Sequence, residues 1–449
     1  MKIAVWHNLP SGGGKRALYY HVQGLVERGH EVACWSLSTA DSDYLPLSAF
    51  GPGRVISHES PAPARGFRQR LLGVYGKKLE AMRLFDEACK RCADEINVGD
   101  FDVLFANSAL PYHMPYVMRH TRIPKLLYLQ EPCRQLYEAW PILPWVAGTP
   151  DDLSLPRLPS FRPNLFLSEY LRLRILRMQA KQEWLNARSC DLLLVNSYFS
   201  RENILRTYGV DARVCYLGVD TRLFRNLGVD RERFIVGLGS FDPIKGIDLA
   251  IEAVSLLEQP RPPLVWISNS ASERYECEMK ELASSLGVDL EIRMMVSDAE
   301  LVETLNRAAL MLYTSKLEPF GLAPLEANAC GLPVVAVAEG GVRETIIDGV
   351  NGFLVERDAE SLAAAAGRLL SNPVLAREMS DSATINVRSK WRVEHSIDRI
   401  EAFLDGCLKR SSNPLDRKAP DTTDSAMEDS RLPVNLEPLP HPLARAETL

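Results

Sequence analysis

Two glutamates eight positions apart, Glu318 and Glu326, are the residues whose types and spacing best suit chemistry in this chain. The Pro-Phe-Gly segment at residues 319–321 disfavours a continuous helix between them. We expect a helix to begin at Pro324, because the first helical residue needs no partner for its N–H. Glu326 would then lie in the first helical turn, where the helix dipole favours its negative charge.

The loop before this helix predicts a site for an oxygen-rich, partly anionic ligand. The backbone N–H groups of Phe320, Gly321 and Leu322 would be offered to such a ligand just before the helix start. Each glutamate carboxylate can accept two hydrogen bonds and so bind a vicinal diol. Ribose and hexoses carry vicinal diols, which indicates a nucleotide or a sugar as the ligand.

Glycine turns recur where strands end and helices begin, a geometry that can approach a phosphate. One turn contains Gly341 and Arg343, directly after the strand PVVAVAE. Another contains Ser240 and Lys245, and the Lys245 ammonium is suited to stabilising a diphosphate leaving group. A further turn, at residues 12–14, opens the first helix of the chain.

Strands that alternate with helices must position these turns. The first 35 residues read as strand, glycine turn, helix and strand, and apolar strands recur at residues 100–107, 123–130 and 190–197. A second unit of the same kind begins near residue 234. The alternation predicts an α/β fold in which each half contains a parallel sheet.

The same patterns suggest the domain limits. We expect a first domain at residues 1–215 and a second at 216–395, followed by a helix at 396–410 that returns to the first domain. Six prolines fall within residues 140–166, which predicts an irregular lid. Residues 411–449 contain six prolines and no glycine or aromatic residue, which predicts a disordered tail.

The composition excludes several classes of protein. Apolar residues make up 46% and charged residues 24% of the 449, as in soluble globular proteins. The net charge of −6 provides no basic excess for nucleic acid. No apolar run could span a membrane, and nine scattered cysteines suggest reduced thiols, so we expect a cytoplasmic protein. Cys89 and Cys92 have ligand spacing, but they lie in a helical stretch without further ligands, so no metal site is expected.

These motifs together resemble the retaining glycosyltransferases of family 4. Glu318 and Glu326 match the family's Glu-x7-Glu pattern, and the sequence AVAEGGVRETIIDGVNGFLV matches its donor-side segment. The resemblance covers roughly residues 1–405. It implies the GT-B fold, in which two Rossmann-like doubly wound domains face a cleft. It also implies a UDP- or GDP-linked sugar as donor, no metal or other cofactor, and transfer with retention.

The resemblance also assigns roles to residues. It implies that Glu326 binds the donor ribose and that Glu318 contacts the transferred sugar at the reacting face. The backbone of Phe320, Gly321 and Leu322 would hold sugar hydroxyls or phosphate.

Further donor contacts follow from the resemblance at the glycine turns. Lys245 would neutralise the diphosphate, and Gly13 and Gly14 would let the first domain approach the donor phosphates. Gly341 and Arg343 belong to the matching donor-side segment.

Two departures from the family pattern stand out. Ser240 occupies the position of a phosphate-binding arginine, and the cations that might substitute are Arg343, Lys15 and Arg16. The family also often has a histidine near the reacting carbon. Here that neighbourhood contains Asn107, and the nearest histidine is His113.

We therefore predict a glycosyltransferase that acts on a glycan, a lipid-linked sugar or another acceptor hydroxyl, in cell-surface polysaccharide or glycolipid synthesis. The departures motivate an alternative, a non-catalytic nucleotide-sugar-binding protein. A GxGxxA match at residues 12–17 also suggests an oxidoreductase, but the next strand lacks the acidic residue that would bind ribose. The basic, apolar helix around Arg172, Arg174 and Arg177 suggests peripheral contact with the inner face of a membrane.

Overall fold

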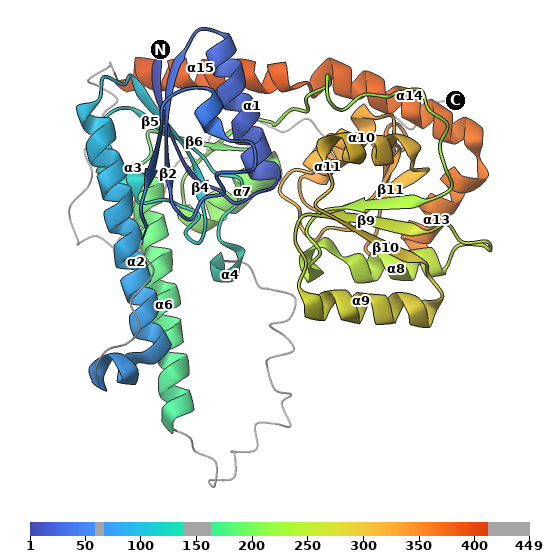
Figure 1. Cartoon of the computed structure of the whole chain (residues 1–449), viewed down its shortest axis with the longest axis horizontal. Coiled ribbons are helices and arrows are strands. Elements are labelled where there is room, and N and C mark those ends of the chain that lie inside the picture. The colour runs from blue at the N-terminus through green and yellow to red at the C-terminus, as the bar shows by residue number, and fades with distance from the viewer. Residues whose placement is uncertain (59–66, 138–162, 412–449) are drawn as a thin grey trace, which may run out of the picture.

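The computed structural model describes residues 1–58, 67–137 and 163–411. Within these ranges the chain forms two α/β units that lie side by side, with helix α14 (Pro373–Lys390) along the second unit and helix α15 (Val393–Ser411) along the first (Figure 1). Most of the predicted lid and all but the first residue of the predicted tail lie outside the described residues.

In the described residues the first sheet has seven strands, all parallel, in the order β3-β2-β1-β4-β5-β6-β7. Its strands are β1 Lys2–Asn8, β2 Glu31–Leu37, β3 Gly53–Ile56, β4 Val103–Ala109, β5 Lys125–Tyr128, β6 Leu192–Val195 and β7 Arg213–Val214. Its helices are α1 Gly13–Glu27, α2 Phe67–Val98, α3 Val117–His120, α4 Arg134–Tyr137, α6 Pro163–Arg188 and α7 Tyr198–Tyr208, with a short turn η1 at Leu47–Ala49.

The second sheet has six described strands, also all parallel, in the order β10-β9-β8-β11-β12-β13. They are β8 Ile235–Leu238, β9 Leu264–Ser268, β10 Leu290–Met294, β11 Leu310–Tyr313, β12 Val334–Val337 and β13 Gly352–Val355. The helices of this unit are α8 Ile247–Ser255, α9 Glu273–Leu286, α10 Asp298–Arg307, α11 Leu322–Ala329, α12 Val342–Thr345 and α13 Ala359–Ser371, with the turn η4 at Pro243–Lys245.

Strand β1 shows why the sheets form where they do. Its apolar side chains, Ile3 to Trp6, alternate between two apolar layers, and all four are fully buried. Ile3 and Val5 pack on the layer that contains α1 and α15, whereas Ala4 and Trp6 pack on the layer that contains α2. Burial on both faces is the normal state of a parallel sheet covered by helices.

The chain crosses between the units twice, and the two crossings are joined. The N–H of Val219 donates to the carbonyl of Trp391 at 2.8 Å, and the N–H of Val393 donates back to Val219 at 3.0 Å. Helix α15 then packs along α1, where Nε2 of His21 forms a hydrogen bond with Oγ of Ser396 at 2.7 Å. Gly24 permits this close approach, because a Cβ there would lie 2.1 Å from Ile397.

Three element boundaries differ from the predicted ones. Helix α6 begins at Pro163, so the predicted lid ended four residues too late; proline is well tolerated at a first helical position. Helix α15 begins at Val393 rather than 396 and includes Ser411, which was assigned to the tail. Cys89 and Cys92 are fully buried on α2 within the apolar layer beneath the first sheet.

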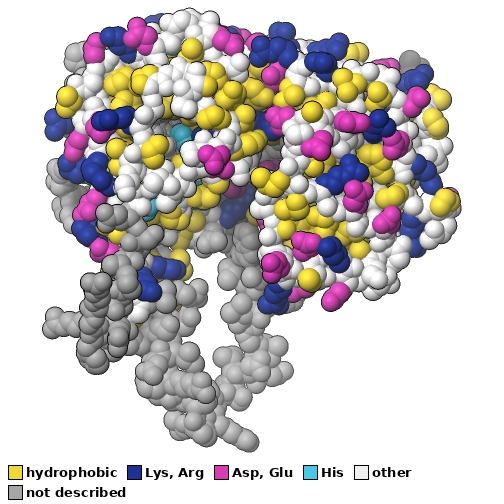
Figure 2. All heavy atoms as spheres, in the orientation of Figure 1, with side chains coloured by type: hydrophobic (Ala, Val, Ile, Leu, Met, Phe, Trp, Pro, Cys, Tyr) yellow, Lys and Arg dark blue, Asp and Glu magenta, His cyan; other side chains and the backbone are white. Residues whose placement is uncertain are grey.

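The surface offers no field of one charge on the face drawn in Figure 2. Basic and acidic side chains are interspersed over both units there. In the part of the chain that the structure describes, no helix is both long enough and apolar enough to cross a membrane.

Candidate functional site at the junction of the two sheets

An ion pair joins two of the predicted site residues. The Nζ atom of Lys245 lies 2.7 Å from Oε2 of Glu318, and both side chains are about one-fifth exposed, at 20% and 23%. Lys245 ends the turn η4 after β8, and Glu318 follows β11, so neighbouring strands of the second sheet position them. Gly246, directly after Lys245, has a φ of 65° and packs against Thr314, where a Cβ would lie 2.5 Å from the backbone oxygen, so glycine lets the turn approach the end of β11.

Both members of this pair are held in their charged forms. Burial alone would raise the pKa of Glu318, but the Lys245 ammonium and, more weakly, the Arg134 guanidinium hold it below its usual value. Burial alone would lower the pKa of Lys245, but Glu318 raises it above its usual value. The site therefore holds a carboxylate and an ammonium ready for a polar ligand.

Helix α11 begins earlier than the sequence suggested. It begins at Leu322, so Pro324 is its third residue and Glu326 its fifth, and the prediction that Glu326 lies in the first turn is wrong. Gly321 caps the helix with a φ of 94°, a conformation that glycine adopts without strain. Proline is tolerated at the third position because the first four N–H groups of a helix have no helical partner.

Glu326 is buried and faces the first unit. Its side chain lies 3.9 Å from the guanidinium of Arg16, which also pairs with Asp298 at 2.6 Å. Only 6% of Glu326 is exposed. Burial raises its pKa to about 7, against the lowering effect of Arg16, while Asp298 adds to the rise. Through Arg16, helix α1 of the first unit therefore contacts Glu326, the residue predicted to bind the donor ribose.

The glycine turn before α1 also meets the second unit. A Cβ on Gly13 would lie 3.7 Å from Leu322, so these two predicted donor residues are neighbours across the junction. Gly14 lies against Gln130, just after the end of β5, where a Cβ would come within 2.8 Å of the side-chain amide. Glycine at this position lets α1 approach the ends of the strands.

The glycine turn at 340–341 supports the Glu318 loop from behind. The N–H of Gly341 donates to the carbonyl of Glu318 at 2.7 Å. A Cβ on Gly340 would lie 2.3 Å from that same carbonyl, and one on Gly341 would lie 2.1 Å from Pro319 O. Arg343 is exposed, and its Nε donates to Gly340 O at 3.0 Å. The predicted donor residue Gly341 therefore packs against the backbone of the loop.

The side chains of Phe320 and Ser240 both interact with nearby residues of the protein. The Phe320 ring is 2% exposed and packs with Tyr216 and Trp391 from the two crossings, at centroid distances of 6.2 and 5.7 Å. The Ser240 hydroxyl donates to Asp242, which caps the turn η4 by accepting from Ile244 at 2.9 Å. In this state Ser240 has the role of a turn residue.

Asn107 and His113 both come from the region after the middle of β4. Asn107 is 1% exposed, and its Nδ2 is buried without a hydrogen-bond partner. His113 is half-buried and donates from Nδ1 to the carbonyl of Glu131 at 3.1 Å. Asn107 therefore lies inside the first unit near the carboxyl end of β4, and His113 contacts the loop after β5.

Sequence reasoning missed several contacts that join the units. Arg134 donates to the backbone carbonyls of Lys316, at 3.0 Å, and Leu317, and it pairs with Glu131 at 2.7 Å. Ser197 donates to Pro319 O at 2.5 Å. The only sequence signal for these residues was their place at the end of a predicted strand, for Ser197, or a few residues beyond one, for Arg134.

Glu344 is another residue that sequence reasoning missed. Its carboxylate accepts from the backbone N–H groups of Tyr198 and Phe199 at 3.0 Å and from the hydroxyl of Tyr216 at 2.9 Å. It therefore binds the N-terminus of α7 in the first unit, where the helix dipole favours a carboxylate.

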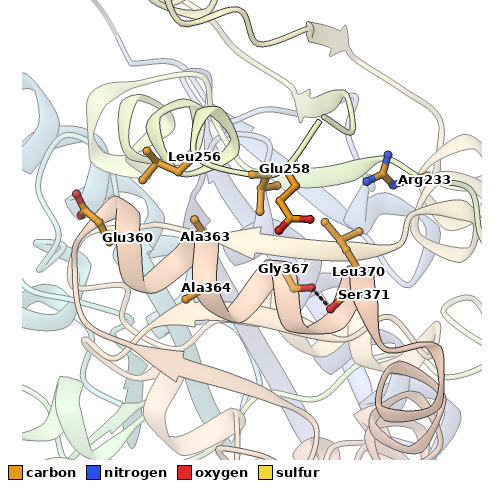
Figure 3. Close-up of a pocket in the computed structure, with 10 residues that line it drawn as sticks. Arg233, Leu256, Glu258, Glu360, Ala363, Ala364, Gly367, Leu370 and Ser371 are labelled. Carbon is orange, nitrogen blue, oxygen red and sulfur yellow. Dashed lines mark hydrogen bonds between the residues drawn. The ribbon is translucent and has the colours of Figure 1, made fainter. Parts of the chain in front are cut away.

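A separate hollow of about 560 Å³ lies elsewhere in the second unit, between the end of α8 and helix α13 (Figure 3). None of the predicted site residues lines it. Its charged lining residues are Arg233, Glu258 and Glu360. Among the described residues, no group of three or more His, Cys, Asp or Glu side chains is placed to hold a metal ion.

Two Rossmann-like sheets whose loops meet at one junction define the GT-B class of proteins. Anabaena HepE, solved with UDP and glucose, has a TM-score of 0.65 and 18% identity, covering 90% of this chain and 99% of that chain. Sucrose-phosphate synthase from Thermosynechococcus elongatus has a TM-score of 0.65 and 20% identity, covering 91% and 99%. These likenesses confirm the predicted GT-B fold.

Sequence comparison gives the family. The model of "Glycosyltransferase Family 4" matches residues 11–223, and that of "Glycosyl transferases group 1" matches residues 220–386. The chain belongs to family 4 of the glycosyltransferases, as its motifs predicted.

Two curated relatives show how far the likeness extends. A D-inositol 3-phosphate glycosyltransferase of Geodermatophilus obscurus is 25% identical over 89% of this chain and 85% of its own length. An N-acetyl-alpha-D-glucosaminyl L-malate synthase of Bacillus anthracis is 26% identical over 45% of this chain and 54% of its own length. The second alignment spans about half of each protein.

Proposed function

We propose that this glycosyltransferase moves a sugar from a nucleotide-diphosphate sugar to an acceptor hydroxyl, with retention and without a metal ion. The observation that carries the proposal is the charged Lys245–Glu318 pair, which lies at the junction together with buried Glu326. A diphosphate leaving group needs a cation, and a sugar and a ribose need carboxylate acceptors. The neighbours solved with UDP support a nucleotide donor.

In the proposed reaction Glu326 binds the ribose and Glu318 holds the transferred sugar. Lys245 shifts from Glu318 towards the diphosphate and stabilises the charge that develops as the bond to the anomeric carbon breaks. The acceptor hydroxyl attacks from the face the diphosphate leaves, and a leaving-phosphate oxygen takes its proton. Asn107 and His113 are the candidates for the acceptor side.

The acceptor belongs to the first unit in this proposal. The relatives' names describe acceptors that carry anionic groups, a phosphate in one and malate in the other. We propose an acceptor of comparable chemistry on a glycan, a lipid-linked sugar or a small molecule. Work at the inner face of a membrane would use exposed Leu173 and Tyr170 of α6 beside Arg174 and Arg177.

The test is a panel of UDP- and GDP-sugars with release of the nucleoside diphosphate as the readout. We expect release with at least one donor, undiminished by EDTA, and an α-linked product from an α-linked donor by NMR. Binding of a donor without release, with glycan, lipid and anionic acceptors present, would establish the alternative of a non-catalytic binder.

The role of Lys245 has a direct test. Lys245→Ala should lower the rate of diphosphate release by roughly 100-fold or more, the usual effect of losing one charge-stabilising group, with a smaller change in donor affinity. The matched control is Lys280→Ala, an exposed lysine on α9 that pairs with Glu276. Equal single-turnover rates for Lys245→Ala and the wild type would reject the role.

A further inference from the structure

Helix α6 packs beside α2 and turns one continuous face to the surface of the first unit (Figure 1). Consecutive exposed side chains of its described part are one, three or four residues apart, which is the spacing of a single helix face. They are Tyr170, Leu173, Arg174, Arg177, Lys181, Trp184 and Arg188. We refer to this face as the α6 stripe.

The α6 stripe is positively charged. Its cations are Arg174, Arg177, Lys181 and Arg188, and in the part of the chain that the structure describes none of them has a carboxylate oxygen within 4.0 Å. From Arg174 to Arg188 the helix rises by about 21 Å. The buried Glu183 of the same helix accepts a hydrogen bond from Tyr208 at 2.9 Å and does not belong to the stripe. A row of uncompensated cations attracts an anionic partner.

The described chain ends near one end of this stripe. Asp191 follows Arg188 by three residues, and its carboxylate accepts from the N–H of Lys125 at the start of β5 at 3.0 Å. Helix α15 packs against β5. Burial and, after it, the Asp191 carboxylate raise the pKa of Cys407, near the end of α15, to about 12. The end of α15 therefore lies close to the Arg188 end of the stripe.

The sequence after Ser411 contains a segment of the opposite charge. Its acidic residues are Asp421, Asp424, Glu428 and Asp429, and residues 419–430 contain no lysine or arginine. Ten residues separate Ser411 from Asp421, and they can span up to about 36 Å. Residues 421–429 themselves can span up to about 29 Å, which is enough to follow the row of cations on the stripe.

We propose that residues 421–429 dock on the α6 stripe, with their carboxylates against its cations. Single exposed ion pairs are weak, but several pairs within one chain form at a high effective concentration. The docked segment covers the stripe and excludes other anionic partners from it. This contact does not depend on the proposed sugar transfer, so each can fail without the other.

The experiment is carbodiimide cross-linking of the full chain at low salt, which joins a carboxylate to a lysine that it touches. Lys181 is the amine of the stripe, and mass spectrometry of the monomer should find its Nζ linked to a carboxylate of residues 421–429. About 0.5 M NaCl should lower the yield by roughly fivefold or more, because salt screens exposed charges. A monomer without this link, or with these carboxylates linked mainly to other lysines, would overturn the proposal.

Variants assign the link to the stripe. Lys181→Arg keeps the charge and should lose the link, since it removes the amine. Arg177→Gln leaves Lys181 in place but removes a neighbouring cation, so the yield should fall severalfold. Arg388→Gln, at an exposed position on α14, is the matched control and should keep the yield of the wild type. Equal yields for Arg177→Gln and the wild type, with the same circular dichroism, would reject the stripe as the docking surface.

Two further measurements separate this contact from other partners. Links between ¹⁵N-labelled and unlabelled chains in a mixture would place the acidic segment on a second copy and overturn the contact within one chain. Neutralising the four acidic residues to Asn and Gln should strengthen any binding of phosphatidylglycerol vesicles that depends on Arg177. Vesicle binding that Arg177→Gln abolishes and that the neutralised variant leaves unchanged would assign the stripe to a membrane instead.

Discussion

At the scale of single residues, the two glutamates of one short segment have opposite acid–base behaviour. The pKa of Glu318 is below its usual value because Lys245 lies 2.7 Å away, although burial acts in the other direction. The pKa of Glu326 is about 7 because burial outweighs Arg16 at 3.9 Å. The surroundings alone therefore lower the pKa of one glutamate and raise the pKa of the other, although the side chains are identical.

Donor binding should depend on pH through Glu326. The ionised carboxylate accepts ribose hydroxyls, so donor affinity should rise by up to about tenfold between roughly pH 6 and 8, as the group ionises around 7. An unfolded glutamate titrates near 4.5, so the folded state binds more protons between 4.5 and about 7. This group's contribution to the free energy of unfolding therefore falls as pH rises through that window. Calorimetric titration of UDP across this range measures the affinity.

The matched control removes the titration. Glu326→Gln should bind UDP weakly at every pH, with no step near 7, whereas Glu356→Gln, at an exposed position, should retain the step. A step that persists in Glu326→Gln would assign the pH dependence to another group.

At the scale of elements, short turns hold the site more than long helices do. The turn at Gly340 and Gly341 touches the backbone of Glu318 and Pro319 so closely that neither position has room for a side chain. Gly341 has an ordinary φ of −78°, so its requirement is steric and not conformational. Packing against backbone cannot be relieved by a change of rotamer.

Gly341→Ala should therefore damage the site by moving the Glu318 loop. We expect a loss of stability of about 1–3 kcal/mol from overpacking and a loss of donor binding by the folded protein. Chemical denaturation and UDP titration measure the two effects. Gly406→Ala is the matched control, since a Cβ there meets nothing within 4 Å. Normal UDP affinity in Gly341→Ala would show that the turn does not position the loop.

At the scale of the whole molecule, the two units are joined on several sides. Arg16 reaches Asp298, Arg134 reaches the carbonyls before Glu318, and Glu344 reaches the start of α7. The crossings pair through Val219, and α15 returns to α1. Residues of both units contact the Glu318 loop, so a change in how the units are placed relative to each other would move the loop.

Glu344→Ala should loosen this joint while leaving each unit folded. The variant loses two hydrogen bonds to α7 of the first unit and one to Tyr216 in the crossing, and leaves their donors to water. We expect kcat to fall about tenfold or more with UDP affinity within about twofold, because positioning across the junction is lost while the donor ligands remain.

Scattering measurements of the radius of gyration and steady-state kinetics test this expectation. Glu356→Ala, an exposed glutamate in the loop after β13, serves as the matched control and should behave like the wild type. A fall in UDP affinity equal to the fall in kcat would indicate a merely structural role for Glu344.

Much of the fold and part of the site could be predicted from local patterns. Buried strands, glycine turns and the Glu318–Glu326 spacing are properties of short segments. The start of α11 was misplaced because Pro324 resembles a first helical residue, while Gly321, with its positive φ, begins the helix earlier. The sequence suggested Arg343 as a phosphate-binding cation, but its side chain is exposed, whereas the adjacent Glu344 contacts the start of α7 in the first unit.

The sequence by itself determined the α/β alternation, the family and the residues available for chemistry, because these depend on local periodicity and short motifs. Only the tertiary structure decided which of them meet. Arg16 and Glu326 are 310 residues apart in the sequence, and no local pattern records that the first turn of α1 lies against α11. Likewise the environment that raises the pKa of Glu326 and buries Lys15 arises from packing between distant segments, where burial and neighbouring charges set the chemistry.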